Sequence, residues 1–304
     1  MATAKKKSSA KKRPIKKTTS SKAVTKKANT KVKSVAVEKK AKAVKTPTKL
    51  PRLELVKRFH IFSAFVSILI AIGAVTLLGS QAANFTINYS AKDPIASVNQ
   101  TVLGPATESI ATVEYRYLIA GAFTLFAILS ILLATLLRKK YEAGVNNSTS
   151  GIRWIITGIN MGVIFSLVSV FAGVQDILTT KMVGLLILVT AVLLWLAERD
   201  NKQVSSPRWA TYVTSLFTGV FAWLPLVVAL LGTYVFGMER FSWYVYVLAL
   251  LLLFASVRFS TNLYRYIKYP KTRGDYVNWE EKYLSNELFM KLSFAAVIFV
   301  ALID

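Results

Sequence analysis

The sequence predicts an all-α membrane protein, a bundle of seven transmembrane helices with a short β-hairpin outside the membrane. Three observations support this: seven long apolar stretches, a hydrophobic content of 54%, and a positive mean hydropathy despite a net charge of +24. A soluble chain of 304 residues would ordinarily form two domains. Such a chain could not bury so many apolar side chains in continuous runs, so composition already favours the membrane.

The seven apolar stretches are the expected membrane spans. A span needs about 20 apolar residues to cross the hydrocarbon core. The fourth stretch is the shortest, and Lys181 beside it could extend it by reaching toward the membrane surface. The stretches are 59–80, 115–137, 154–174, 182–197, 210–232, 242–262 and 284–303.

Most of the positive charge lies in residues 1–52, which hold 19 of the 39 Lys and Arg residues and one acid, Glu38. With little to bury, this domain should be disordered, and residues 53–304 should form the membrane domain. A lysine-rich tail could bind nucleic acid, but this one has no aromatic residue to stack on bases. The anionic inner leaflet of the membrane is therefore the favoured partner.

The loops between the spans predict the orientation. Twelve Lys and Arg residues lie in loops 138–153, 198–209 and 263–283, against three in the loops between them. Because loops rich in Lys and Arg stay in the cytoplasm, the N-terminus should be cytoplasmic and Asp304 extracellular, in the cell membrane.

The first external loop should contain the β-hairpin. Phe85, Ile87 and Tyr89 alternate with polar residues, a period typical of a strand. Gly104 and Pro105 should form a turn further along this loop.

Lys291 is the ionisable side chain that lies deepest in a predicted span. It is about seven residues into the last stretch, roughly 10 Å from its start. Glu287 lies one helical turn earlier on the same face. Because an ionisable residue inside a membrane is costly, Lys291 is either a structural partner of Glu287 or a functional group.

A buried lysine can form a Schiff base with an aldehyde. On the last helix of a seven-helix bundle, such a lysine suggests a retinal Schiff base. The aromatic side chains that could wall a polyene are Trp223, Tyr244, Tyr246 and Phe254.

A set of short motifs and single residues lies along the chain in a particular order and spacing: Arg153-Trp154-Ile155, Trp195-Leu196-Ala197-Glu198-Arg199, Phe217, Pro225, Phe259, Asn262 and Lys291. In these residues the chain resembles the heliorhodopsins, a branch of the microbial rhodopsins with a cytoplasmic N-terminus, over about residues 53–304. The resemblance implies covalently bound all-trans retinal on Lys291, a light-sensing role and a homodimer, with a cytoplasmic signalling partner that the sequence does not identify.

The sequence departs from the family around the expected Schiff base. The family's counterion glutamate is here Ile156, and a helix-one histidine and glutamine are here Ser67 and Ile70. Glu287 stands where the family has a serine. We infer that the counterion has moved to the last helix. At about 4 Å and an effective dielectric near 20 this pair is worth about 4 kcal/mol, enough to keep a Schiff base protonated.

Three other functions remain open. A seven-helix scaffold without chromophore is the main alternative, because the family's counterion is missing. An ion transporter is disfavoured, because no other span offers an evident buried carboxylate, and the third span has only Thr157, Asn160, Ser166 and Ser169 as polar groups. An enzyme is least expected, since the chain has no cysteine, only His60 as histidine, and no visible nucleophile–base set. The same composition argues against a metal site.

Overall fold

The computed structural model describes residues 51–93, 103–202, 204–237, 240–269 and 276–303. All of them belong to one compact unit, Pro47–Asp304. The predicted basic tail, residues 1–52, lies outside the described residues except for Pro51 and Arg52, which begin the first helix.

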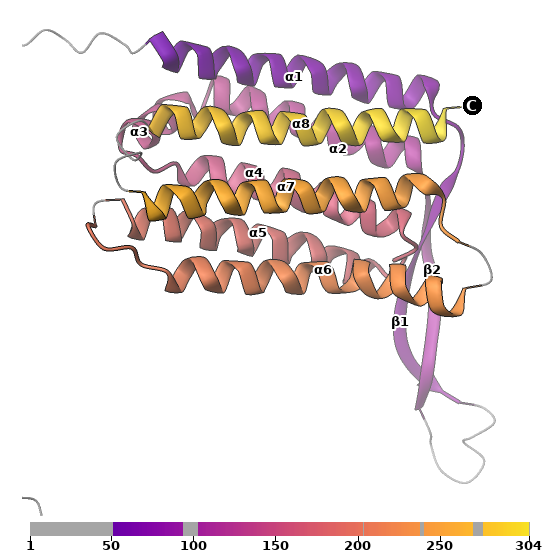
Figure 1. Ribbon diagram of the computed structural model, residues 1–304. Coiled ribbons are helices and arrows are strands. Elements are labelled where there is room, and N and C mark those ends of the chain that lie inside the picture. The colour runs from indigo at the N-terminus through magenta and orange to yellow at the C-terminus, as the bar shows by residue number, and fades with distance from the viewer. Residues whose placement is uncertain (1–50, 94–102, 203, 238–239, 270–275, 304) are drawn as a thin grey trace, which may run out of the picture. The chain divides into compact units, whose positions relative to one another are not determined.

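Within the described ranges the chain forms eight helices and one two-stranded sheet (Figure 1). Seven of these helices, all except α3, are long and apolar enough to cross a membrane. The predicted fold class, a seven-helix bundle with a short β-hairpin, is confirmed. In chain order the elements are α1 (Pro51–Leu77), β1 (Ala82–Lys92), β2 (Leu103–Glu114), α2 (Tyr115–Ala134), α3 (Arg138–Asn146), α4 (Gly151–Phe171), α5 (Ile177–Asp200), α6 (Ala210–Phe236), α7 (Trp243–Lys268) and α8 (Tyr276–Leu302).

Two spans, α5 and α8, exceed by the most the lengths that the hydropathy of the sequence predicted. Helix α5 has 24 residues, so the short fourth span expected at 182–197 was wrong. Helix α8 begins at Tyr276 rather than near residue 284, because polar side chains in its first turns, Glu280 among them, are buried against other helices. Lys291 therefore lies about 22 Å along α8, near its middle, and not roughly 10 Å from its start.

Helix α4 is the most enclosed span. In its most apolar 18-residue stretch, 78% of the residues are buried, against 50% or less in the corresponding stretches of the other spans. Glycines bring α5 close to it: a Cβ on Gly162 would lie 2.7 Å from the carbonyl oxygen of Gly184, and a Cβ on Gly158 would lie 2.7 Å from Cβ of Ala191. Larger residues would push the helices apart, as is usual where small residues line contacts between membrane helices.

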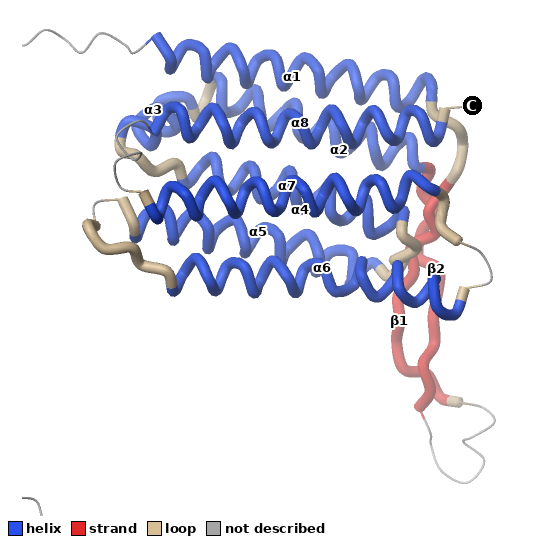
Figure 2. The backbone as a smooth tube through the Cα atoms, in the orientation of Figure 1, coloured by secondary structure: helices blue, strands red, loops and turns tan. Residues whose placement is uncertain are grey.

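The two strands pair antiparallel along their whole length, at one end of the helices (Figure 2). The hairpin prediction is thereby confirmed. The predicted turn at Gly104 and Pro105 was wrong, because both residues pair within the sheet, with Ala91 and Ser90. Proline is tolerated there because an edge strand does not need every backbone N–H for pairing.

The hairpin is attached to the start of α5. The backbone N–H of Thr86 in β1 donates to the carbonyl of Gln175 at 3.0 Å. The next residue, Asp176, caps α5 by accepting hydrogen bonds from the backbone N–H and the hydroxyl of Thr179, at 2.7 and 2.6 Å. These bonds stabilise the carboxylate and lower the pKa of Asp176. The bond of Thr86 thus joins the hairpin to a capped, well-defined start of α5.

Because the seven spans alternate in direction, the loops predicted to be cytoplasmic all lie at one end of the bundle. We call it the basic end, since it carries α3 with Lys139 and Lys140 and the last turn of α7 with Arg265 and Lys268. The other end, with the sheet, is the hairpin end. There α1 and α8 finish side by side, as the hydrogen bond from the N–H of Gly79 to the carbonyl of Leu302 shows. Which end faces the cytoplasm remains a prediction.

The orientation can be measured by labelling single cysteines, because the chain has none of its own. Ser90 lies in β1 and Ser205 between α5 and α6, and both are exposed. We expect a cysteine at position 90 to react with an impermeant reagent on intact cells, and one at position 205 to react only after lysis. The reverse pattern would contradict the predicted orientation.

Candidate functional site

Lys291 and Glu287 form an ion pair in the middle of α8. Nζ of Lys291 lies 2.7 Å from Oε1 of Glu287, and the two residues are 1% and 8% exposed. Nζ also lies 5.2 Å from the centre of the Phe126 ring on α2, within range of a cation–π interaction. The two charged groups are therefore buried inside the protein, as their spacing in the sequence indicated.

Helix α4 supplies two hydrogen-bond donors to the same carboxylate. Thr157 Oγ1 donates to Oε2 of Glu287 at 2.8 Å, and Asn160 Nδ2 donates to Oε1 at 2.6 Å. Both donors are buried and lie three residues apart, so they share one face of α4. The sequence identified these two residues only as polar groups of the third span. Their common face was the available sign that they act together.

An apolar cavity of about 730 Å³ lies among α4, α5, α6 and α7. Sites for small molecules usually have volumes of about 300–1,000 Å³. Thr157 belongs to the lining, so the cavity wall directly contacts the Glu287 carboxylate, although Lys291 itself is not part of the lining. Other lining side chains include Met161, Phe165, Trp223 and Phe259.

The four aromatic residues predicted to wall a chromophore lie in different places. Trp223 lines the cavity and packs edge-on against Phe165, with ring centres 5.2 Å apart. The lining does not include the other three. Tyr244 lies near the start of α7, Tyr246 is 37% exposed, and Phe254 is 50% exposed on the outer face of that helix. The sequence does not reveal which face of α7 turns inward.

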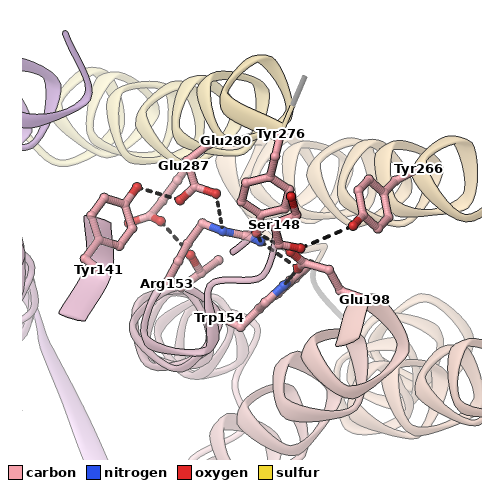
Figure 3. Close-up of polar contacts among 10 residues, drawn as sticks. Tyr141, Ser148, Arg153, Trp154, Glu198, Tyr266, Tyr276, Glu280 and Glu287 are labelled. Atoms are coloured by element: carbon pink, nitrogen blue, oxygen red, sulfur yellow. Dashed lines mark hydrogen bonds and ion pairs between the residues drawn. The ribbon is translucent and has the colours of Figure 1, made fainter. Parts of the chain in front are cut away.

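A second buried charged cluster lies nearer the basic end (Figure 3). The Arg153 guanidinium on α4 lies 2.8 Å from Glu198 on α5, through Nη2, and 2.8 Å from Glu280 on α8, through Nε. All three residues are at most 1% exposed. The rings of Trp154 and Tyr283 lie within 4.3 Å of the guanidinium carbon. This cluster joins three helices through one cation.

Hydroxyl and indole groups satisfy the remaining carboxylate oxygens of this cluster. Tyr141 on α3 donates to Glu280 at 2.5 Å, and both Tyr276 and the Trp154 indole donate to Glu198. Burial raises the pKa of Tyr141 well above its usual value, so its phenol stays protonated and remains a donor.

The expectation that no other span holds a buried carboxylate was wrong. Glu198 and Glu280 are both enclosed, because Arg153 and neighbouring hydroxyls replace the water they lose. A sign was present in the sequence: Tyr276, Glu280 and Tyr283 recur at helical spacing with Glu287, which puts them on one face of α8. Low hydropathy before residue 284 concealed this face.

Fold and site together define a class: a seven-helix membrane protein with a charge-paired lysine in its last helix and an apolar cavity nearby. A protein-family model described as heliorhodopsin matches residues 56–303. The chain belongs to the heliorhodopsin family. No match was found among curated proteins.

Family membership confirms the predicted resemblance and indicates the general properties of the chain. The chain is a multi-pass membrane protein of the rhodopsin type, a type that generally carries retinal. Heliorhodopsins are generally light-sensing proteins without enzymatic activity.

The Arg153 cluster should contribute strongly to stability. In Arg153→Met the carboxylates of Glu198 and Glu280 would stay buried without their cation, a change that typically costs about 3–5 kcal/mol. Arg199→Met is the matched control, because Arg199 is exposed and lies 4.0 Å from Asp200, and such surface pairs contribute about 1 kcal/mol or less. Thermal unfolding in detergent, followed by circular dichroism, would compare them. Equal midpoints for both variants would contradict a structural role for the cluster.

Proposed function

We propose that this chain is a retinal-binding light sensor of the membrane, in which Lys291 holds the chromophore as a Schiff base and Glu287 is the counterion. The observation that carries the proposal is the buried Lys291–Glu287 pair in the middle of α8, joined through Thr157 to the wall of an apolar cavity.

The residues present are chemically suited to retinal. An aldehyde needs an amine, and Lys291 is the buried amine among the described residues. A polyene needs an apolar site, which the lining with Phe165 and Trp223 supplies. Retinal, when bound, would supply the absorption of visible light and a change of shape. The protein would hold the chromophore, exclude water and fix the charge beside it.

Glu287 is well placed to replace the missing counterion of the third span. Ile156, which stands at the family's glutamate position, is buried and carries no charge. The carboxylate reaches the same region from α8, where Thr157 and Asn160 hold it from the side of α4. Two donors in addition to Lys291 favour the charged form of the carboxylate.

Sensing without net ion transport fits the distribution of buried charges. Among the described residues, the buried acidic, basic and histidine side chains beyond the Lys291–Glu287 pair are His60, Arg153, Glu198 and Glu280, on the side of the basic end. Toward the hairpin end, the buried polar side chains of the described spans are the hydroxyls of Ser169 and Thr180. A pump needs groups that exchange protons on both sides of the active group, and the hairpin side of the described spans offers no buried carboxylate or imidazole.

A scaffold without chromophore is the second candidate, favoured by the fact that Glu287 already neutralises Lys291 in a structural ion pair.

The remaining parts of the proposal concern partners. They are a homodimer, contact of the basic tail with an anionic inner leaflet rather than nucleic acid, and an unidentified cytoplasmic signalling partner.

Lys291→Ala should abolish the visible absorption band that all-trans retinal produces with the wild-type protein, because the amine that binds the aldehyde is lost. Lys282→Ala is the control, since Lys282 lies on the same helix but is exposed over the Trp279 ring. Absorption spectra of the purified proteins would be compared at equal concentration. A colourless wild type would favour the scaffold, and a coloured Lys291→Ala would move the chromophore to another residue.

Illumination of cells that contain the pigment should leave the external pH unchanged, because the hairpin side of the site has no buried proton-exchanging residue among those described. The measurement is external pH during light pulses, with and without a protonophore. A light-driven pH shift that the protonophore abolishes would overturn the non-transporting role.

A further inference from the structure

Thr157 lies at the boundary between the cavity and the ion pair. It is part of the cavity lining, and its hydroxyl donates to Oε2 of Glu287 at 2.8 Å. The other oxygen, Oε1, is held by Asn160 and Lys291. Among the described residues, Thr157 is thus the side chain through which the cavity wall contacts the carboxylate.

The hydrogen bond of Thr157 differs from those of several other hydroxyls in these helices. Ser169, Thr190 and Thr214 each donate to the backbone carbonyl four residues earlier in their own helix. Thr157 instead reaches across to α8. The usual alternative for a helical threonine is a rotamer that bonds its own backbone. A threonine in a helix thus has two favoured arrangements, and Thr157 adopts here the one that serves Glu287.

We propose that Thr157 is a positioning residue that couples the contents of the cavity to the charge of Glu287. The inference rests on the proposed function for its consequence, the tuning of a chromophore, but not for the contact itself. Cβ of Thr157 carries both the hydroxyl and a methyl group, so a molecule packed against this side chain selects its rotamer. A cavity ligand thereby decides whether Oε2 keeps its donor.

The electrical consequence follows from the chemistry of a buried carboxylate. A donor to Oε2 stabilises the charged form and draws negative charge away from Lys291. Without that donor the carboxylate is a stronger partner for the cation and takes up a proton at higher pH. Loss of the hydrogen bond from Thr157 would shift the absorption maximum of a pigment to the blue. Removal of the carboxylate charge itself, as in Glu287→Gln, would shift the maximum to the red.

The first test uses the pigment formed with all-trans retinal. Thr157→Val keeps the shape and removes the donor, and Thr157→Ser keeps the donor. We expect Thr157→Val to shift absorption to the blue and to raise the pH of the acid-induced colour change by about one to two units, the size expected for one hydrogen bond to a charged group. Thr157→Ser should keep the absorption maximum and the colour-change pH close to those of the wild type. A Thr157→Val pigment with the absorption and the colour-change pH of the wild type would show that the hydroxyl does not tune Glu287 and would overturn the proposal.

The second test needs no Schiff base. All-trans retinol, which has no aldehyde, is added to the retinal-free protein while the infrared carboxylate band of Glu287 is recorded, assigned by its loss in Glu287→Gln. We expect retinol to change this band in the wild type, to change it less in Thr157→Ser, which keeps the hydroxyl but lacks the methyl group, and to leave it unchanged in Thr157→Val. Thr190→Val is the comparator, because Thr190 lines the same cavity but bonds its own helix. Retinol should still change the carboxylate band in that variant.

The two tests separate the two hypotheses. A retinol response that depends on Thr157, together with a wild type that forms no pigment, would leave the coupling in place and reject the retinal function. A retinol response that is absent, or equal in Thr157→Val, would overturn the coupling whether or not a pigment forms.

Discussion

The pairing of buried charges is the constraint on which the rest of this structure depends. Burying an unpaired charge in the interior of a membrane bundle is costly, so each buried cation must meet its carboxylates. Lys291 meets Glu287 within α8, and Arg153 meets Glu198 and Glu280 across three helices. These requirements set α4 against α5 and α8, and the glycines of α4 and α5 allow the close approach.

Placing the carboxylate on the same helix as the lysine changes what a helix movement can do. A pair four residues apart on α8 keeps its separation when α8 shifts as a rigid body. The hydrogen bonds from Thr157 and Asn160 cross to α4, so they are the contacts that would break. Relative motion of α4 and α8 would therefore alter the charge that Glu287 presents to Lys291 without separating the two groups, a mechanism that would suit the proposed sensor.

Most of the fold could be predicted from the sequence, because span number and hairpin depend on local composition. Seven apolar stretches and the alternation at Phe85, Ile87 and Tyr89 are local signals, and both predictions were confirmed. The errors arose where partners were distant. The start of α8 was placed too late because Glu280 lowers the hydropathy of this segment. Only the structure shows that Glu280 is buried beside Arg153. The turn at Gly104 and Pro105 was wrong because strand register decides it.

The sequence by itself determined the membrane bundle, the lysine in its last helix and the glutamate one turn before it, because helical periodicity fixes neighbours four residues apart. Only the tertiary structure decided what surrounds them. It brought Thr157 and Asn160 from α4 to the carboxylate, placed Trp223 in the cavity wall and left Phe254 on the outer face. The reason is physical: which face of a helix turns inward depends on packing against other helices, and two faces of similar apolarity look alike in sequence.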